Sequence, residues 1–90
     1  MNTPFDWSLV RAFLAALEQG SLLGAGRVLG LSQPTVGRHI AQFEAQVGGA
    51  LFERTGRGLR PTELALRLAP GARAMHDGAL ALAQDLSGAR

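Results

Sequence analysis

The stretch Leu31-Ser32-Gln33-Pro34-Thr35-Val36-Gly37-Arg38-His39-Ile40 predicts the beginning of an amphipathic helix. Ser32 is a good N-cap, because its hydroxyl can accept a hydrogen bond from the free N–H groups of the first turn. Pro34 fits that first turn, where the missing proline N–H costs little. Apolar residues follow at helical spacing and form one stripe: Val36, Ile40, Phe43 and Val47. We expect this helix over residues 32–47.

The opposite face of this helix carries no acid and no large apolar side chain. It offers an amide, a guanidinium and small spacers, with the Thr35 hydroxyl beside them. Such a surface suits a helix that lies against base edges and phosphates. The sequence therefore predicts a DNA-recognition helix, whose outer residues are Pro34, Arg38, Ala41, Gln42 and Ala45.

Composition limits the possible functions. Ninety residues make one domain, and the absence of cysteine excludes disulfides and cysteine-ligated metal sites. His39 and His76 lie too far apart for ligand-like spacing, so we expect neither a metal nor a cofactor. No apolar run approaches the roughly 18 residues of a membrane span, and the N-terminus lacks a signal-peptide pattern. We therefore expect a cytoplasmic, nucleoid-associated chain without a membrane partner.

The basic residues are concentrated in the middle of the chain. All nine are arginine, and five of them lie between Arg27 and Arg60 against two acids, Glu44 and Glu53. Arginine suits phosphate and guanine through its planar fork of donors. The excess indicates a nucleic-acid partner, although an ordinary solvated charged surface would look the same by composition alone.

Two helices are expected before the recognition helix. The first spans about residues 6–18 and buries Leu9, Val10, Phe13, Leu14 and Leu17, with Trp7 at its entry. The second spans residues 22–29 with three inward residues: Ala25, Val28 and Leu29. Its two glycines, Gly24 and Gly26, weaken it by about 1 kcal/mol each, which is tolerable where a backbone passes close by. A short glycine-containing turn then makes a helix-turn-helix.

A small β-hairpin is expected after the recognition helix. Two short extended runs flank the turn Thr55-Gly56-Arg57-Gly58, and Phe52 and Leu59 can anchor them to the core. The arginines of this wing project outward, and Arg57 at its tip is placed to enter a minor groove. The alternative is a purely structural hairpin with solvated arginines.

Thr62 can cap a last helix over residues 63–87, with a bend near residues 66–71 caused by Pro70. Its apolar residues recur at steps of four and three, which is typical of a pairing seam. We expect the seam to pair with a second copy, the alternative being that it folds back on its own domain. It comprises Leu64, Leu68, Ala72, Met75, Ala79, Leu82 and Leu86. The predicted fold is thus mostly α: a winged helix-turn-helix over residues 1–61, followed by a long dimerisation helix over residues 62–90.

From Phe5 to about Met75, the chain resembles the N-terminal winged helix-turn-helix of LysR-type transcriptional regulators. The ordered matches include Gly20-Ser21, Leu31-Ser32-Gln33-Pro34, Phe43-Glu44 and Leu51-Phe52-Glu53-Arg54. Each match is weak, but their order and spacing are specific. The resemblance implies a bacterial transcription regulator that binds a DNA site of dyad symmetry as a dimer, or as a dimer of dimers in a longer protein.

The resemblance also implies roles for individual residues. Base contacts would come from the start of the recognition helix, namely from Gln33, Pro34, Thr35 and Arg38. Phosphate or minor-groove contacts would come from Ser21, Ser32, Gln42, Arg54, Arg57 and Arg60. The chain departs from the family pattern at Gly37, where a small polar residue is usual, and at the glycines of the second helix. The effector-binding domain of the family is absent, so we expect a DNA-binding part of a longer regulator or else a stand-alone form, with no small-molecule ligand.

Other functions fit the sequence less well. A winged-helix protein-interaction module would favour an acidic or apolar outer face on the recognition helix. RNA binding lacks an aromatic platform, since the chain has no tyrosine. An enzyme is not expected: Ser32 and His39 on one helix are about 10 Å apart along its axis and cannot share a hydrogen bond.

Overall fold

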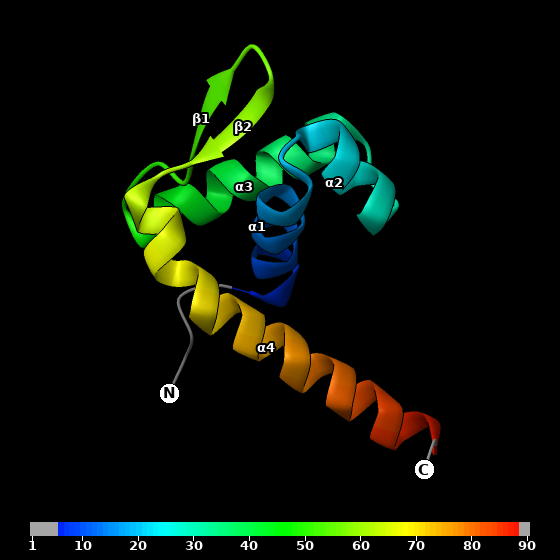
Figure 1. The fold of residues 1–90 in the computed structure, drawn as a ribbon. Helices are drawn as coiled ribbons and strands as arrows, with labels where there is room; N and C mark the ends of the chain where they lie inside the picture. Colours follow the sequence, from blue (N-terminus) through cyan, green and yellow to red (C-terminus); the bar gives the residue numbers. More distant parts are fainter. Residues whose placement is uncertain (1–5, 89–90) are drawn as a thin grey trace.

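A computed structural model describes residues 6–88 of the chain. Residues 1–5 of the expected domain 1–61, which include Phe5, lie outside the described residues. So do residues 89–90 of the expected dimerisation region 62–90. The elements follow in the order α1 (Trp7–Gln19), α2 (Leu22–Leu29), α3 (Gln33–Val47), β1 (Phe52–Thr55), β2 (Gly58–Pro61) and α4 (Glu63–Ser87). Figure 1 shows α1, α2 and α3 packed together, the hairpin standing above α3, and α4 running away from them. The predicted winged helix-turn-helix with a long C-terminal helix is confirmed.

Local capping explains why the helix boundaries agree with the sequence. A polar side chain accepts a backbone N–H three residues later at the start of each described helix: Asp6, Ser21, Ser32 and Thr62. At the other end, Gly20, Gly30 and Gly48 close α1, α2 and α3 in the left-handed conformation that glycine adopts most readily. The cap of α3 by Ser32 is therefore confirmed.

The core is centred on α1. Phe13 is fully buried and packs against two other aromatic rings, with centroid distances of 5.6 Å to Phe43 and 5.9 Å to Phe52. These contacts join the first helix to the recognition helix and to the wing. Leu17 and Trp7 pack at the margin of the same cluster. A cluster of three aromatic rings thus fixes α3 and the hairpin against α1.

The expectation that Val28 faces inward is wrong, because 61% of this residue is exposed. Ala25 and Gly26 are the buried residues of α2. A Cβ atom at Gly26 would clash with the carbonyl oxygen of Leu31, so the backbone does pass close to this glycine, as expected. A Cβ atom at Gly24 would instead meet the side chains of Gln19 and Ser21, which come just before α2. Because the contact face of α2 is centred between Ala25 and Gly26, Val28 is turned toward solvent.

The long helix α4 divides into two parts with different surroundings. In its first half, Ala65, Ala69 and Ala72 are buried, and Leu64 and Leu68 pack against the core. From Met75 onward almost every residue is exposed. The helix continues through Pro70 as one element, while the bend expected there stays a prediction. The division into residues 1–61 and 62–90 also stays a prediction. The first half of α4 packs on the core of the preceding helices, so it shares that core with residues 1–61.

None of the helices described within residues 6–88 is long and apolar enough to cross a lipid bilayer.

Candidate nucleic-acid interface

The start of α3 presents the residues predicted to read bases. Gln33 and Pro34 are exposed at its first two positions. The Ser32 hydroxyl oxygen accepts from the Thr35 backbone N–H at 3.3 Å and lies 2.9 Å from the Thr35 hydroxyl. Arg38, one turn later, donates from Nη2 to the same Thr35 hydroxyl at 3.1 Å. The four predicted base-contacting residues therefore lie within two helical turns, and two of them are hydrogen-bonded to each other.

An open hollow joins the outer face of α3 to the first strand of the wing. It has a volume of about 490 Å³, and its lining brings Arg54 of β1 together with Gln33, Pro34 and Arg38 of α3. Leu22 of α2 also lines it. The structure thus places a predicted phosphate-contacting arginine beside the predicted base-contacting residues.

The wing is a two-stranded antiparallel hairpin in which Thr55 pairs with Gly58 across the turn. Arg57 is exposed at its tip, and its backbone N–H donates to the Thr55 hydroxyl at 3.2 Å. One residue pair below the turn, the Leu59 N–H donates to the Gly20 carbonyl oxygen at 2.9 Å. This bond ties the hairpin to the turn between α1 and α2. Gly58 permits the close approach, because a Cβ there would clash with the same carbonyl oxygen.

Arg60 is the one wing arginine that an acid neutralises in the described structure. Glu53 and Arg60 face each other in the strand register, and Arg60 Nη2 lies 2.6 Å from Glu53 Oε1. Both side chains are mostly exposed. Exposed pairs of this kind contribute at most about 1 kcal/mol, so a phosphate can compete for the guanidinium. The pair lowers the positive charge that Arg60 offers while DNA is absent.

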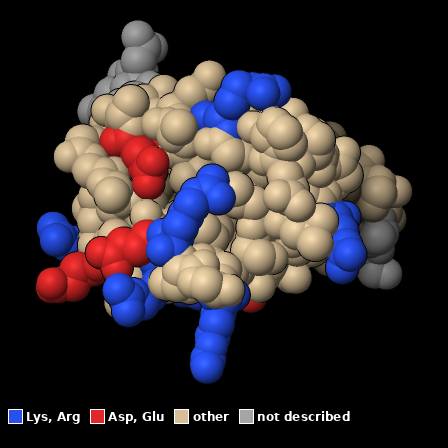
Figure 2. Space-filling view, turned by 90° about the horizontal axis from the view of Figure 1, so that it is seen from above, with Lys and Arg blue, Asp and Glu red and all other residues tan. Residues whose placement is uncertain are grey.

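The other acid of the basic region, Glu44, is engaged with the backbone that leads from α3 to the wing. The Glu44 carboxylate accepts from the Leu51 N–H at 2.8 Å, and the residue is half-buried. It therefore holds the chain between α3 and β1. Figure 2, seen from above the wing, shows arginine side chains projecting from this face, while most acidic side chains in view lie toward one side.

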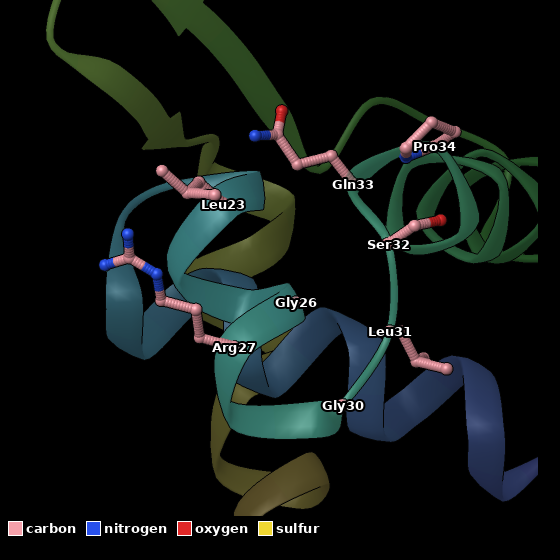
Figure 3. A pocket seen from close by; sticks show the side chains of 8 residues that line it. All are labelled: Leu23, Gly26, Arg27, Gly30, Leu31, Ser32, Gln33 and Pro34. Carbon is pink, nitrogen blue, oxygen red and sulfur yellow. The ribbon is translucent and has the colours of Figure 1, made fainter.

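A second open hollow lies between α2 and the start of α3 (Figure 3). There the Gln33 side chain extends toward Leu23 of α2, and Arg27 lies one turn further along α2. Arg27 is exposed, and within residues 6–88 it forms no ion pair. Arg27 belongs to the basic excess in the middle of the chain, but no contact was predicted for it. Its only sequence signal was its position in that region.

The remaining predicted residues take different positions. Ser21 is half-buried as the cap of α2, accepting from the Gly24 N–H at 2.9 Å, whereas Gln42 is exposed on α3. His39 is half-buried, and its Nδ1 atom is buried without a hydrogen-bond partner in the described structure. His76 lies on the surface of α4, with its ring centroid 6.3 Å from that of Trp7.

A family model described as the bacterial regulatory helix-turn-helix protein, lysR family, matches residues 7–66. The chain belongs to this family. It is 41% identical over 68 residues to the putative regulator PtxE of Stutzerimonas stutzeri, covering 76% of this chain and 35% of that protein. It is 46% identical over 59 residues to the transcriptional activator protein LysR of Escherichia coli, covering 66% of this chain and 19% of that protein.

Solved structures of LysR-family proteins share the fold. The oxidized form of Corynebacterium glutamicum OxyR superposes with a TM-score of 0.88 at 26% identity, covering 98% of this chain and 27% of that one. The complex of the CbnR DNA-binding domain with DNA gives a TM-score of 0.80 at 26% identity, covering 96% of this chain and all of that one. The chain spans less than half the length of the curated LysR-family relatives it matches.

Gly37, a departure from the LysR-family pattern, is not required by packing. A Cβ built there would lie 3.8 Å from Leu22 Cδ1, an ordinary contact distance. The glycine at position 37 therefore leaves a small gap on the outer side of α3, within the hollow that Arg38 and Arg54 line. A serine would fit this position in the LysR-family fold without moving its neighbours.

Proposed function

We propose that this chain binds double-stranded DNA in a sequence-dependent way, as the DNA-binding part of a dimeric bacterial transcription regulator. The observation that carries the proposal is the surface shared by Gln33, Pro34, Arg38 and Arg54, which line one open hollow without an acidic residue among them. Base-reading side chains and a phosphate-binding arginine are the two components that such recognition needs. A role in catalysis is not part of the proposal, because the relatives are transcriptional regulators.

In this proposal α3 lies in the major groove. Gln33 accepts and donates to the N6/N7 edge of adenine, while the Pro34 ring or the Thr35 methyl packs on a thymine methyl. Arg38 contacts a base or a phosphate, and Arg57 reaches the minor groove from the wing. Phosphates are held by Ser21, Ser32, Gln42, Arg54 and Arg60, to which the exposed position of Arg27 adds one more candidate.

A second copy completes the proposed DNA-binding unit. The exposed half of α4 carries the seam residues Met75, Ala79, Leu82 and Leu86, of which Leu82 is 60% and Leu86 80% exposed. Pairing along this half would remove that apolar surface from water. It would also place two copies of α3 in successive major grooves about 34 Å apart, which requires a site of dyad symmetry. Because its partner is chromosomal DNA, the protein would act at the nucleoid.

Selection of bound sequences from a random duplex library, at physiological salt, tests the proposal. The expected result is a dyad-symmetric motif with half-sites one helical turn apart. Gln33→Ala should lose discrimination at one position in each half-site, by about 1–3 kcal/mol. Gln46→Ala is the matched control, since Gln46 is exposed near the far end of the same helix. Equal losses on selected and random DNA would contradict base reading by Gln33.

Salt dependence provides a second, independent test of the same surface. With about six to eight phosphate contacts per dimer, log K against log salt should fall with a slope of roughly −5 to −7. A flat dependence would refute the electrostatic part of the proposal. Absence of any DNA binding would instead favour a protein-interaction module.

A further inference from the structure

A short hydrogen-bonded chain connects the cap of α3 to its first outward arginine. The Ser32 and Thr35 hydroxyls are 2.9 Å apart, and the Thr35 hydroxyl accepts from Arg38 Nη2 at 3.1 Å. Ser32 also accepts from the Thr35 backbone N–H. The Thr35 hydroxyl is therefore held from both sides, by the cap before it and by the guanidinium one turn after it.

We propose that Thr35 is a positioning residue for Arg38, and that its hydroxyl, rather than its methyl group, sets how well Arg38 discriminates between bases. This inference rests on the proposed function, because it assigns a role within the same DNA-binding surface. It gives Thr35 a task different from the direct thymine contact that its methyl group could make.

The physical reason is the flexibility of an exposed arginine. A free arginine side chain loses substantial rotamer entropy when it is held against a base, and holding it beforehand reduces that cost. The Thr35 hydroxyl is suited to hold it, because this hydroxyl is itself fixed by its hydrogen bond to Ser32. The Arg38 guanidinium thus has one N–H engaged and the others available to a base or a phosphate.

The Thr35 hydroxyl that holds Arg38 is uncharged, and this matters to DNA binding as much as the position in which it holds the guanidinium. Arg60 is held by the Glu53 carboxylate, which cancels its charge, whereas Arg38 is held by a hydroxyl, which leaves its charge intact. The acid on the same helix, Glu44, is engaged with the Leu51 N–H instead. Within residues 6–88, Arg38 forms no ion pair. Arg38 is therefore oriented before DNA arrives, and no acid within the described residues offsets its charge.

Two substitutions separate the hydroxyl from the methyl group. Thr35→Val removes the hydroxyl and keeps the shape, whereas Thr35→Ser removes the methyl group and keeps the hydroxyl. In the free protein, NMR relaxation of the Arg38 Nε–H group should report increased motion in Thr35→Val and wild-type behaviour in Thr35→Ser. Ser32→Gly is a second route to the same loosening, because glycine still serves as an N-cap at small cost. Unchanged Arg38 motion in both Thr35→Val and Ser32→Gly overturns the inference.

Binding to selected DNA gives the functional readout. At the base pair whose discrimination Arg38→Ala abolishes, Thr35→Val should reduce discrimination by about threefold to tenfold, the size expected for ordering one flexible side chain. Thr35→Ser should retain it. In the Arg38→Ala background, Thr35→Val should leave the remaining affinity for the selected site unchanged, whereas a merely structural effect on α3 would lower it further.

The opposite pattern, loss with Thr35→Ser and retention with Thr35→Val, overturns the inference in favour of a methyl contact. Thermal unfolding of each variant checks that the helix is intact. If the wild-type protein selects no sequence, the proposed function fails, and the NMR measurement on the free protein still decides whether Thr35 holds Arg38.

Discussion

Removing the Glu44 carboxylate should destabilise the connection between the recognition helix and the wing. Its Oε2 atom accepts from the Leu51 N–H at 2.8 Å, next to a Leu51 side chain that is fully buried. Glu44→Ala leaves this N–H without its acceptor. Hydrogen bonds to charged groups contribute about 1.5–3 kcal/mol, and because Glu44 is half-buried we expect a loss near the lower end, about 1.5–2 kcal/mol.

For a chain of this size, 1 kcal/mol corresponds to a change of about 4–8 °C in Tm, so Glu44→Ala should lower Tm by about 6–16 °C. Alanine is at least as good a helix former as glutamate, so the loss cannot come from helix propensity. Glu44→Gln keeps a neutral acceptor and should lose less, about 1 kcal/mol. Urea unfolding followed by circular dichroism measures each value.

Glu53→Ala is the matched control for this experiment. It also removes one carboxylate, but from an exposed ion pair with Arg60, and should cost at most about 1 kcal/mol. Equal destabilisation by Glu44→Ala and Glu53→Ala would refute the reasoning, because the loss would then follow from net charge and not from the part-buried hydrogen bond.

Three further predictions concern the core, the wing and the long helix. Phe13→Ala should destabilise the fold by about 3–5 kcal/mol in urea unfolding, since Phe13 is fully buried between two aromatic rings; a loss below 1 kcal/mol would contradict its central position. Arg60→Gln should flatten the salt slope of DNA binding by about one unit per copy, and an unchanged slope would mean that Arg60 meets no phosphate. Leu82→Ser should weaken self-association in sedimentation experiments while changing the stability of the isolated chain by less than about 0.5 kcal/mol, because Leu82 is 60% exposed; unaltered association would exclude this half of α4 from the pairing seam.

The sequence by itself determined the elements and their boundaries. The residues 22–29 expected for the second helix and 63–87 for the last agree with the structure. The reason is that caps and stop signals act within one turn: Ser32 bonds to Thr35, and Gly30 closes α2, without any help from distant residues. The exposed outer face of α3 was also predictable, because the helix has a single apolar stripe. That stripe faces the core and leaves the opposite side to solvent.

Only the tertiary structure decided which partner each surface meets. Periodicity identified the stripe along α4 but could not say that Leu64 and Leu68 pack on the chain's own core while Leu86 is exposed. It could not show that Glu44 is engaged with Leu51, or that Arg60 faces Glu53. These contacts join residues seven apart or more, across turns whose geometry no local spacing specifies. A pattern marks what a side chain can do, whereas packing decides which neighbour is within its reach.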